Sequence, residues 1–348
     1  LITTPESLNL LLSSRGGQTL LHGIDTLILD EVHSVVESKR GVYLMSAVER
    51  LVPFSGEFQR ISLSATVNPL PEVARFIGGF TRSGGDFAPR DVHIVEAPPG
   101  KRYSISVRYP EVVAQRPEGE KVWDYLARDL LERISGNRSS LIFVNSRALC
   151  EKLTWKINSA AGRLVAYAHH GSLSREIRAD VEARLKQGEL EAIVATSSLE
   201  MGIDIGALDE VILVQSPDSI ASSIQRIGRA GHQVGATSRG TLYPTHPQDF
   251  IEAAVLSRAI LERDIEPVRM VRGALDVIAQ NIVSKTGIEP WDIDELYLEL
   301  RRSTAYNALT RLEFDLVLNM LVGRYGEHHL PELKPRVRID RIDNRIEA

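Results

Sequence analysis

The sequence predicts an α/β fold built from two parallel-sheet units and a small third module. Five short apolar runs between residues 27 and 214 are each followed by polar residues. Strands that are apolar along their whole length are buried on both faces, as in parallel sheets covered by helices. Helical patterns separate the runs, for example at residues 147–159 and 174–186, and this alternation is typical of strand–helix–strand proteins.

Each apolar run ends where a functional residue is expected. The runs are residues 27–29, 61–63, 141–144, 192–195 and 211–214, and they are followed by Asp30, Ser64, Asn145, Thr196 and Gln215. Open α/β sheets bind their ligands outside the carboxyl ends of the strands. The polar residues therefore predict a functional edge.

A Gly- and Pro-rich stretch at residues 78–99 separates the second run from the third and predicts a domain boundary. We expect residues 1–96 to form an incomplete α/β domain, residues 97–258 a complete one, and residues 259–348 a third module. In that module, helical patterns at 275–284, 294–302 and 313–322 precede an alternating segment at 336–339 and a turn at 343–344. Three helices and a hairpin indicate a winged helix; a helical appendage with a stray strand is the alternative.

The composition is that of an ordinary globular protein, with 43% hydrophobic residues, 25% charged residues and a net charge of −5. Without overall basic character, any binding of nucleic acid must use local patches or backbone amides. The single cysteine, Cys150, excludes a disulfide framework and a Cys-based metal site and indicates a reducing cytoplasm. No apolar stretch reaches membrane-spanning length, so we expect no membrane partner. Residues 1–5 read as a strand end entering a turn, without an initiator Met, which indicates a fragment.

Two adjacent carboxylates, Asp30 and Glu31, follow the first apolar run. Such a pair suits phosphoryl transfer, in which one carboxylate holds Mg²⁺ and the other orients or deprotonates the attacking water. Asp-Glu after a strand is common in proteins, so the pair needs support from elsewhere in the chain.

That support comes from residues 219–232, where Ser219 predicts a helix cap. Arg226 and Arg229 are spaced i,i+3 and share one helix face. Guanidinium groups are always charged and fork onto phosphate oxygens, so this face suits a γ-phosphate. The alternative is a solvated charged face, but Gly228 and Gly231 are poor choices for a plain surface helix.

Seven ordered segments resemble the motifs of superfamily 2 DEAD/DEAH-type helicases. They are residues 3–8 (motif Ib), 30–33 (II), 64–66 (III), 143–147 (IV), 168–173 (IVa), 195–206 (V) and 225–232 (VI). The large helicase-related (Lhr) family is the most similar, because it shares the sequence His-His-Gly-Ser-Leu-Ser that begins at His169 and the final Gly231-His232. That family carries a winged helix after two RecA-like domains, so the resemblance implies that fold here, with the first RecA-like domain incomplete.

The resemblance also assigns roles to single residues. It implies that Asp30 binds Mg²⁺ and that Glu31 activates water, while Arg226 and Arg229 act as arginine fingers supported by Gln225. The implied ATP-binding residues are His33, Gly202, Asp204, Arg226 and Arg229, and the implied coupling residues are Ser64, Ala65 and Thr66. The implied nucleic-acid contacts are Thr4, Pro5, Glu6, Asn145, Ser146, Arg147, His170, Gly171, Ser172, Thr196 and Ser197.

The implied activity is ATP-dependent, Mg²⁺-dependent movement on single-stranded or tailed duplex nucleic acid, with DNA favoured over RNA. Two alternatives stay open: a nucleic-acid-binding module without turnover, and a motor that remodels complexes without separating strands. One departure matters, because no Gly-x-x-x-x-Gly-Lys-Ser/Thr loop occurs and the first lysine, Lys39, lies beyond Glu31. We therefore expect the parent protein to hydrolyse ATP and residues 1–348 alone to be inactive, with an unpaired apolar sheet edge in the first domain.

Overall fold

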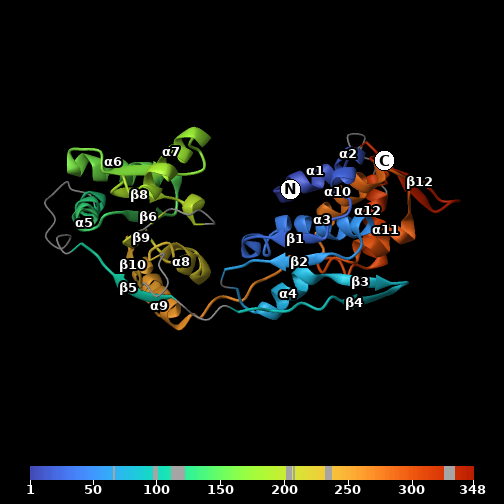
Figure 1. Ribbon diagram of the computed structural model, residues 1–348, viewed down its shortest axis with the longest axis horizontal. Helices are drawn as coiled ribbons and strands as arrows, with labels where there is room; N and C mark the ends of the chain where they lie inside the picture. Colours follow the sequence, from blue (N-terminus) through green and yellow to red (C-terminus); the bar gives the residue numbers. More distant parts are fainter. Residues whose placement is uncertain are drawn as a thin grey trace. The chain divides into compact units, whose positions relative to one another are not determined.

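The computed structural model describes residues 1–65, 67–96, 101–110, 122–200, 206, 208–231, 237–324 and 334–348. The chain divides into two compact units (Figure 1). Unit 1 combines Leu1–Val95 with Pro267–Ala348, and unit 2 is Glu96–Glu266.

The first segment of unit 1 is a small α/β layer. Strands β1 (Thr26–Leu29) and β2 (Gln59–Ser62) pair in parallel. Around them lie α1 (Pro5–Leu12), α2 (Arg15–Leu20), the short 3-10 helix η1 (Val32–Ser34), α3 (Lys39–Ser55), α4 (Leu70–Gly78) and the hairpin of β3 (Phe80–Ser83) and β4 (Asp86–Pro89). The side chains of Ile28 and Leu63 are 60% and 53% exposed. This two-stranded sheet therefore presents apolar surface to solvent.

The second segment of unit 1 is a winged helix. Its helices are α10 (Leu275–Thr286), α11 (Ile293–Leu300) and α12 (Arg311–Leu321), and its antiparallel sheet has the order β11 (Trp291–Asp292), β13 (Arg345–Glu347), β12 (Arg338–Asp340). Helix α12 begins at a capping box in which Thr310 and Glu313 satisfy each other's backbone N–H groups. The prediction of three helices and a hairpin is confirmed, and the last strand is paired rather than stray.

Helix α3 joins the two segments of unit 1. One core cluster places Val42 of α3 among Ile278 and Ile282 of α10. Arg50, also on α3 and 6% exposed, donates to the Ser284 Oγ at 2.8 Å and to the Leu12 carbonyl at 3.0 Å. The winged helix therefore shares a core with the first segment, although about 170 residues of sequence separate them.

A charged cluster reinforces the same junction. The Glu49 carboxylate on α3 has 4% side-chain exposure and accepts from Arg60 at 2.6 Å and Arg90 at 3.0 Å, with Arg302 beyond α11 at 3.8 Å. Three guanidinium groups around one carboxylate compensate for its burial.

Backbone pairing also joins the two segments where the chain returns to unit 1. Pro267 pairs with Asn68, and the Val268 N–H donates to the Asn68 carbonyl at 2.6 Å.

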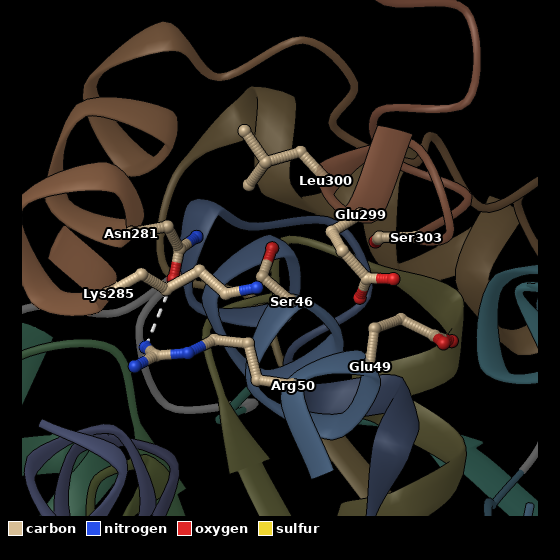
Figure 2. Close-up of a pocket in the computed structure, with 8 residues that line it drawn as sticks. All are labelled: Ser46, Glu49, Arg50, Asn281, Lys285, Glu299, Leu300 and Ser303. Carbon is tan, nitrogen blue, oxygen red and sulfur yellow. Dashed lines mark hydrogen bonds between the residues drawn. The ribbon is translucent and has the colours of Figure 1, made fainter. Parts of the chain in front are cut away.

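A cavity of about 10 Å³, room for about one water molecule, lies within this junction (Figure 2). Its lining residues are Ser46, Glu49, Arg50, Asn281, Lys285, Glu299, Leu300 and Ser303. Lys285 is 7% exposed, and its ammonium lies 4.0 Å from the centre of the Trp291 ring. Burial lowers the pKa of Lys285 to about 8, Arg50 acts in the same direction, and Glu299 opposes it. The buried Asn281 Nδ2 and Ser303 Oγ have no hydrogen-bond partner among the described residues.

Unit 2 is a six-stranded parallel sheet. Its order is β5 (Arg102–Val107), β10 (Thr237–Tyr243), β9 (Glu210–Val214), β6 (Ser140–Val144), β8 (Ala192–Ala195) and β7 (Ala166–His169). The covering elements are α5 (Val122–Gly136), α6 (Arg147–Ala161), α7 (Arg175–Lys186), the 3-10 helix η3 (Ser197–Leu199), α8 (Ile220–Ile227) and α9 (Pro247–Glu262). Strands β6, β8 and β9 are buried along their whole length, as the apolar runs predict.

The two faces of this sheet have separate cores. Helices α7, α8 and α9 contribute to one cluster, and α5 and α6 contribute to the other. The mixed α/β class with a parallel sheet is therefore confirmed. The three-domain division stays a prediction; residue 258, its expected boundary, lies inside α9, which continues to Glu262. No helix in the described part of the chain is both long and apolar enough to span a membrane.

Candidate functional site

In unit 1, the two carboxylates follow β1 as the sequence predicts. Asp30 is exposed, and its Oδ1 accepts from the backbone N–H of Glu31 at 2.9 Å. Glu31 has a left-handed backbone, with φ of 51°. A non-glycine residue seldom adopts this conformation, and such strain is concentrated at functional sites.

His33 connects the carboxylates to the end of the neighbouring strand. Its Nδ1 accepts from the backbone N–H of Ala65 at 3.1 Å, so the ring proton of the neutral form is on Nε2. Nε2 lies 3.3 Å from the Glu31 carboxylate. Ser64 Oγ is also 3.5 Å from Nδ1. The structure therefore brings Glu31, His33, Ser64 and Ala65 together; Thr66 lies outside the described residues.

The chemistry of this group fits a magnesium–nucleotide complex. Mg²⁺ prefers oxygen ligands and is usually held by one or two carboxylates together with substrate phosphates. Asp30 offers an exposed carboxylate, and no cluster of three His, Cys, Asp or Glu residues that could hold a metal alone exists among the residues described.

In unit 2, the predicted arginine helix is α8 (Ile220–Ile227), which holds Arg226; the helix ends before Arg229, so the two arginines do not share one helix face as predicted. Ser219 caps it by accepting from the Ser222 N–H at 3.0 Å. Arg226 in the last turn is only 8% exposed, so the alternative of a solvated charged face is wrong for this residue. Gln225 is half-buried.

Both arginines contact Glu200. Arg226 Nε donates to the Glu200 carboxylate at 2.8 Å, and Arg229 Nε donates to the Glu200 backbone carbonyl at 3.1 Å. Arg226 Nη1 also lies 3.4 Å from Asn145 Oδ1. Sequence reasoning did not single out Glu200, although an acidic residue inside the motif V segment was a visible signal. Gly202 and Asp204, the predicted nucleotide contacts of that segment, lie outside the described residues.

Three predicted nucleic-acid segments meet at one edge of the unit 2 sheet. Strands β6, β8 and β7 are neighbours, and Ala195 pairs with Phe143 on one side and with His169 on the other. The residues that follow these strands are therefore level with one another. They are Asn145, Ser146 and Arg147 after β6, Thr196 and Ser197 after β8, and His170, Gly171 and Ser172 after β7.

The environments at this edge differ. Asn145, Ser146, Arg147, Gly171, Ser172 and Ser197 are exposed, and Thr196 is half-buried. Ser146 caps α6 by accepting from the Leu149 N–H at 3.2 Å. His170 is 5% exposed, and its Nε2 lies 2.7 Å from the Glu151 carboxylate.

His169 lies beneath the same edge. It is 1% exposed, with Nδ1 2.9 Å from Ser198 Oγ and Nε2 3.0 Å from Glu182. Burial lowers the pKa of His169, and Glu182 opposes this effect. The ring therefore fixes the turn after β7 against the turn after β8.

The predicted contacts Thr4, Pro5 and Glu6 belong to unit 1. Thr4 caps α1 by accepting from the Ser7 N–H at 3.3 Å, and Pro5 is the first residue of that helix. Glu6 accepts from Arg40 at 2.7 Å, and this hydrogen bond lowers the pKa of the Glu6 carboxyl to about 2. The Glu6 charge is thereby neutralised, which removes an obstacle to a nearby phosphate.

Comparisons with known proteins agree with this arrangement. The model of the DEAD/DEAH box helicase matches residues 1–74, that of the helicase conserved C-terminal domain matches residues 123–233, and that of the large helicase-related protein winged helix domain matches residues 258–348. The chain is 38% identical to the Lhr helicase/uracil glycosylase of Escherichia coli, covering 97% of the chain and 24% of that protein. It is 39% identical to the ATP-dependent helicase Lhr-Core of Methanothermobacter thermautotrophicus, covering 94% of the chain and 38% of that protein.

A solved structure of the Mycobacterium smegmatis helicase Lhr, bound to ssDNA and AMP-PNP, superposes with a TM-score of 0.89 at 41% identity. The match covers 100% of the chain and 44% of that protein chain. The chain thus spans about a quarter to two fifths of the length of the curated relatives it matches.

Proposed function

The chain belongs to the large helicase-related family of DEAD/DEAH-box helicases, and from this membership we propose that it supplies part of an ATP-driven motor that moves along single-stranded nucleic acid. The Escherichia coli and Methanothermobacter relatives are named as helicases. Because the chain corresponds to only part of each, the activity of the whole protein is an inference from the site.

The observation that carries the proposal is the position of His33 between Glu31 and Ala65: its Nε2 lies 3.3 Å from the Glu31 carboxylate, and its Nδ1 accepts from the Ala65 N–H. In this proposal Asp30 holds Mg²⁺ with ATP, and Glu31 orients the attacking water. A change in nucleotide state at Glu31 can then reach the segment after β2 through a single imidazole ring. Ser64, Ala65 and Thr66 are the proposed coupling residues.

The arginines at the end of α8 are proposed to bind the γ-phosphate. Arg226 and Arg229 would stabilise the charge that develops on transfer, with Gln225 beside them. His33, Gly202 and Asp204 complete the proposed nucleotide site. No Gly-x-x-x-x-Gly-Lys-Ser/Thr sequence occurs in residues 1–348, so we propose that this stretch alone does not turn over ATP.

The level edge of β6, β8 and β7 is the proposed nucleic-acid track in unit 2, with Thr4, Pro5 and Glu6 as the contribution of unit 1. Exposed hydroxyls, amides and helix N-termini bind phosphates without reading bases, so little sequence preference is expected. The substrate is a single strand or tailed duplex, with DNA favoured because the Mycobacterium smegmatis relative is described with ssDNA. The free, buried thiol of Cys150 suits action in the cytoplasm.

The test is nucleic-acid-stimulated ATP hydrolysis by the protein expressed from its complete coding sequence, with and without Glu31→Gln. We expect turnover to fall about 100-fold or more, because a group that orients or deprotonates the nucleophile contributes on that scale. Single-strand binding should be unchanged, because the substitution leaves the proposed track intact.

Glu37→Gln is the matched control. Glu37 is exposed and accepts from the Arg269 N–H at 2.7 Å, a role that an amide oxygen can keep. Full turnover in Glu31→Gln would refute the assigned role. Strand displacement on a tailed duplex separates a helicase from a motor that only remodels complexes, and binding without any ATP turnover would leave a binding module.

A further inference from the structure

Glu200 occupies the point where the two arginines of the proposed γ-phosphate site converge. Its carboxylate accepts from Arg226 Nε at 2.8 Å, and its backbone carbonyl accepts from Arg229 Nε at 3.1 Å and Nη2 at 2.5 Å. The Glu200 backbone is itself fixed, because its N–H donates to the Ser197 carbonyl at 3.1 Å and closes η3. One residue therefore restrains both guanidinium groups.

The carboxylate holds only one edge of Arg226. Of the five N–H donors of a guanidinium, Nε is directed to Glu200 and Nη1 lies near Asn145. Within the described ranges, Nη2 donates to no protein acceptor. The Phe143 ring lies 5.2 Å from the guanidinium carbon and limits its rotation. The Nε side of the Arg226 guanidinium is therefore bound by Glu200, and its Nη2 side can bind another anion.

The charge of Glu200 rules out a role in raising the affinity of this site for phosphate. A carboxylate 2.8 Å from the arginine lowers the positive potential that a phosphate would meet. Glu200 and Arg226 have side-chain exposures of 13% and 10%, so solvent screens this effect only partly. A residue that weakens attraction for phosphate while fixing the geometry of its partner acts through orientation.

We propose that Glu200 is the positioning residue of the arginine pair: it orients Arg226 through its carboxylate and Arg229 through its carbonyl toward a nucleoside triphosphate. This inference rests on the proposed function, because it assumes that these arginines meet the γ-phosphate. It assigns to motif V the task of setting the geometry of motif VI.

The experiment is a double-mutant cycle on ATP hydrolysis by the intact protein. The variants are Glu200→Ala, Glu200→Gln, Arg226→Ala and the double variant Glu200→Ala/Arg226→Ala. We expect Glu200→Ala to lower kcat roughly 10- to 100-fold, the scale of a small misplacement of a catalytic group. The KM for ATP should stay level or fall, because a negative charge has been removed. Glu200→Gln keeps an acceptor oxygen for Nε and should lose less.

The cycle separates positioning from general structural damage. If Glu200 acts through Arg226, Glu200→Ala should cost little in the Arg226→Ala background, so the two losses should not add. Glu191→Ala is the matched control, because Glu191 forms an exposed ion pair with Arg163 in the same unit, and kcat should be unchanged. Single-strand binding without nucleotide and the thermal melt of each variant report folding; if Glu200→Ala does not fold, Glu200→Gln takes its place in the cycle.

Each outcome has one meaning. Non-additive losses in kcat with a level KM support the inference. Full kcat in both Glu200 variants, or losses that add in the double variant, would overturn it while leaving the function of Arg226 intact. Full ATPase in Arg226→Ala would instead overturn the proposed function of that arginine, and the inference with it.

Discussion

Replacing Lys285 with methionine should stabilise unit 1 at neutral pH. Lys285 is 7% exposed in the junction between α3 and the winged helix, and burial lowers its pKa from 10.5 to about 8. At ~1.36 kcal/mol for each pKa unit, the charged ammonium is disfavoured by about 3 kcal/mol. Lys285→Met should therefore raise the free energy of unfolding by about 3 kcal/mol at pH 7.

The pH dependence gives a second signature of the same group. Between pH 8 and 10.5 the folded state has released the Lys285 proton and the unfolded state still holds it. The unfolded state then binds more protons, so the stability of the wild type rises with pH across this window. The methionine variant lacks this contribution. The stability difference between the two proteins should shrink steadily from pH 8 and vanish near pH 10.5.

The assay is urea unfolding followed by Trp291 fluorescence. The other tryptophans, Trp123 and Trp155, lie in unit 2 and are replaced by phenylalanine in both proteins. Lys39→Met is the matched control, because Lys39 on α3 is 63% exposed and should change stability by less than about 0.5 kcal/mol. A less stable Lys285→Met protein at pH 7, or a difference that does not vary with pH, would refute the reasoning.

Four buried or capping groups, Glu49, Ser146, His169 and Cys150, should each contribute measurably to stability or reactivity. Glu49→Gln should destabilise unit 1 by about 3–5 kcal/mol in urea, because it removes the charge that compensates Arg60 and Arg90; a loss below 1 kcal/mol would contradict this. Ser146→Ala should cost unit 2 about 1 kcal/mol through loss of the α6 cap, measured by Trp123 fluorescence. The pKa of His169 is lowered by burial, so the unfolded state takes up its proton first as the pH falls; stability present above about pH 6.5 should be lost below it, and His169→Gln should flatten this slope in urea titrations. Burial raises the pKa of the Cys150 thiol to about 11, so a thiol reagent at pH 8 should label it only as fast as unit 2 opens, and rapid labelling of folded protein would contradict this.

Burial explains how much of the fold could be anticipated from sequence. Strands β6, β8 and β9 are apolar along their length because both faces are covered, and their pattern is unambiguous. Strands β5 and β10 were not anticipated, because polar side chains interrupt them; the Ser106 and Thr241 hydroxyls instead bond to each other at 2.8 Å. Hydroxyl pairs of this kind resemble loop chemistry when only the order of residues is known.

Sequence position alone predicts part of the candidate site. Asp30 and Glu31 could be found because they directly follow a strand, and Arg226 because it follows a capped helical pattern; Arg229 lies just beyond the end of that helix. Glu200 could not be assigned a role, because its contacts exist only once η3 lies beside α8. Contacts between one residue of the η3 region and the end of α8, about 25 positions later in the sequence, produce no local periodic pattern.

The shared core of α3 also dictates an order of assembly. Residues 1–95 are synthesised before the helices that cover Val42, and residues 96–266 lie between them in the sequence. Residues 96–266 carry their own two cores and can condense meanwhile. Contacts that span long stretches of chain form slowly, so we expect unit 2 to fold before unit 1 is complete. The apolar side of α3 would be exposed to chaperones throughout that interval.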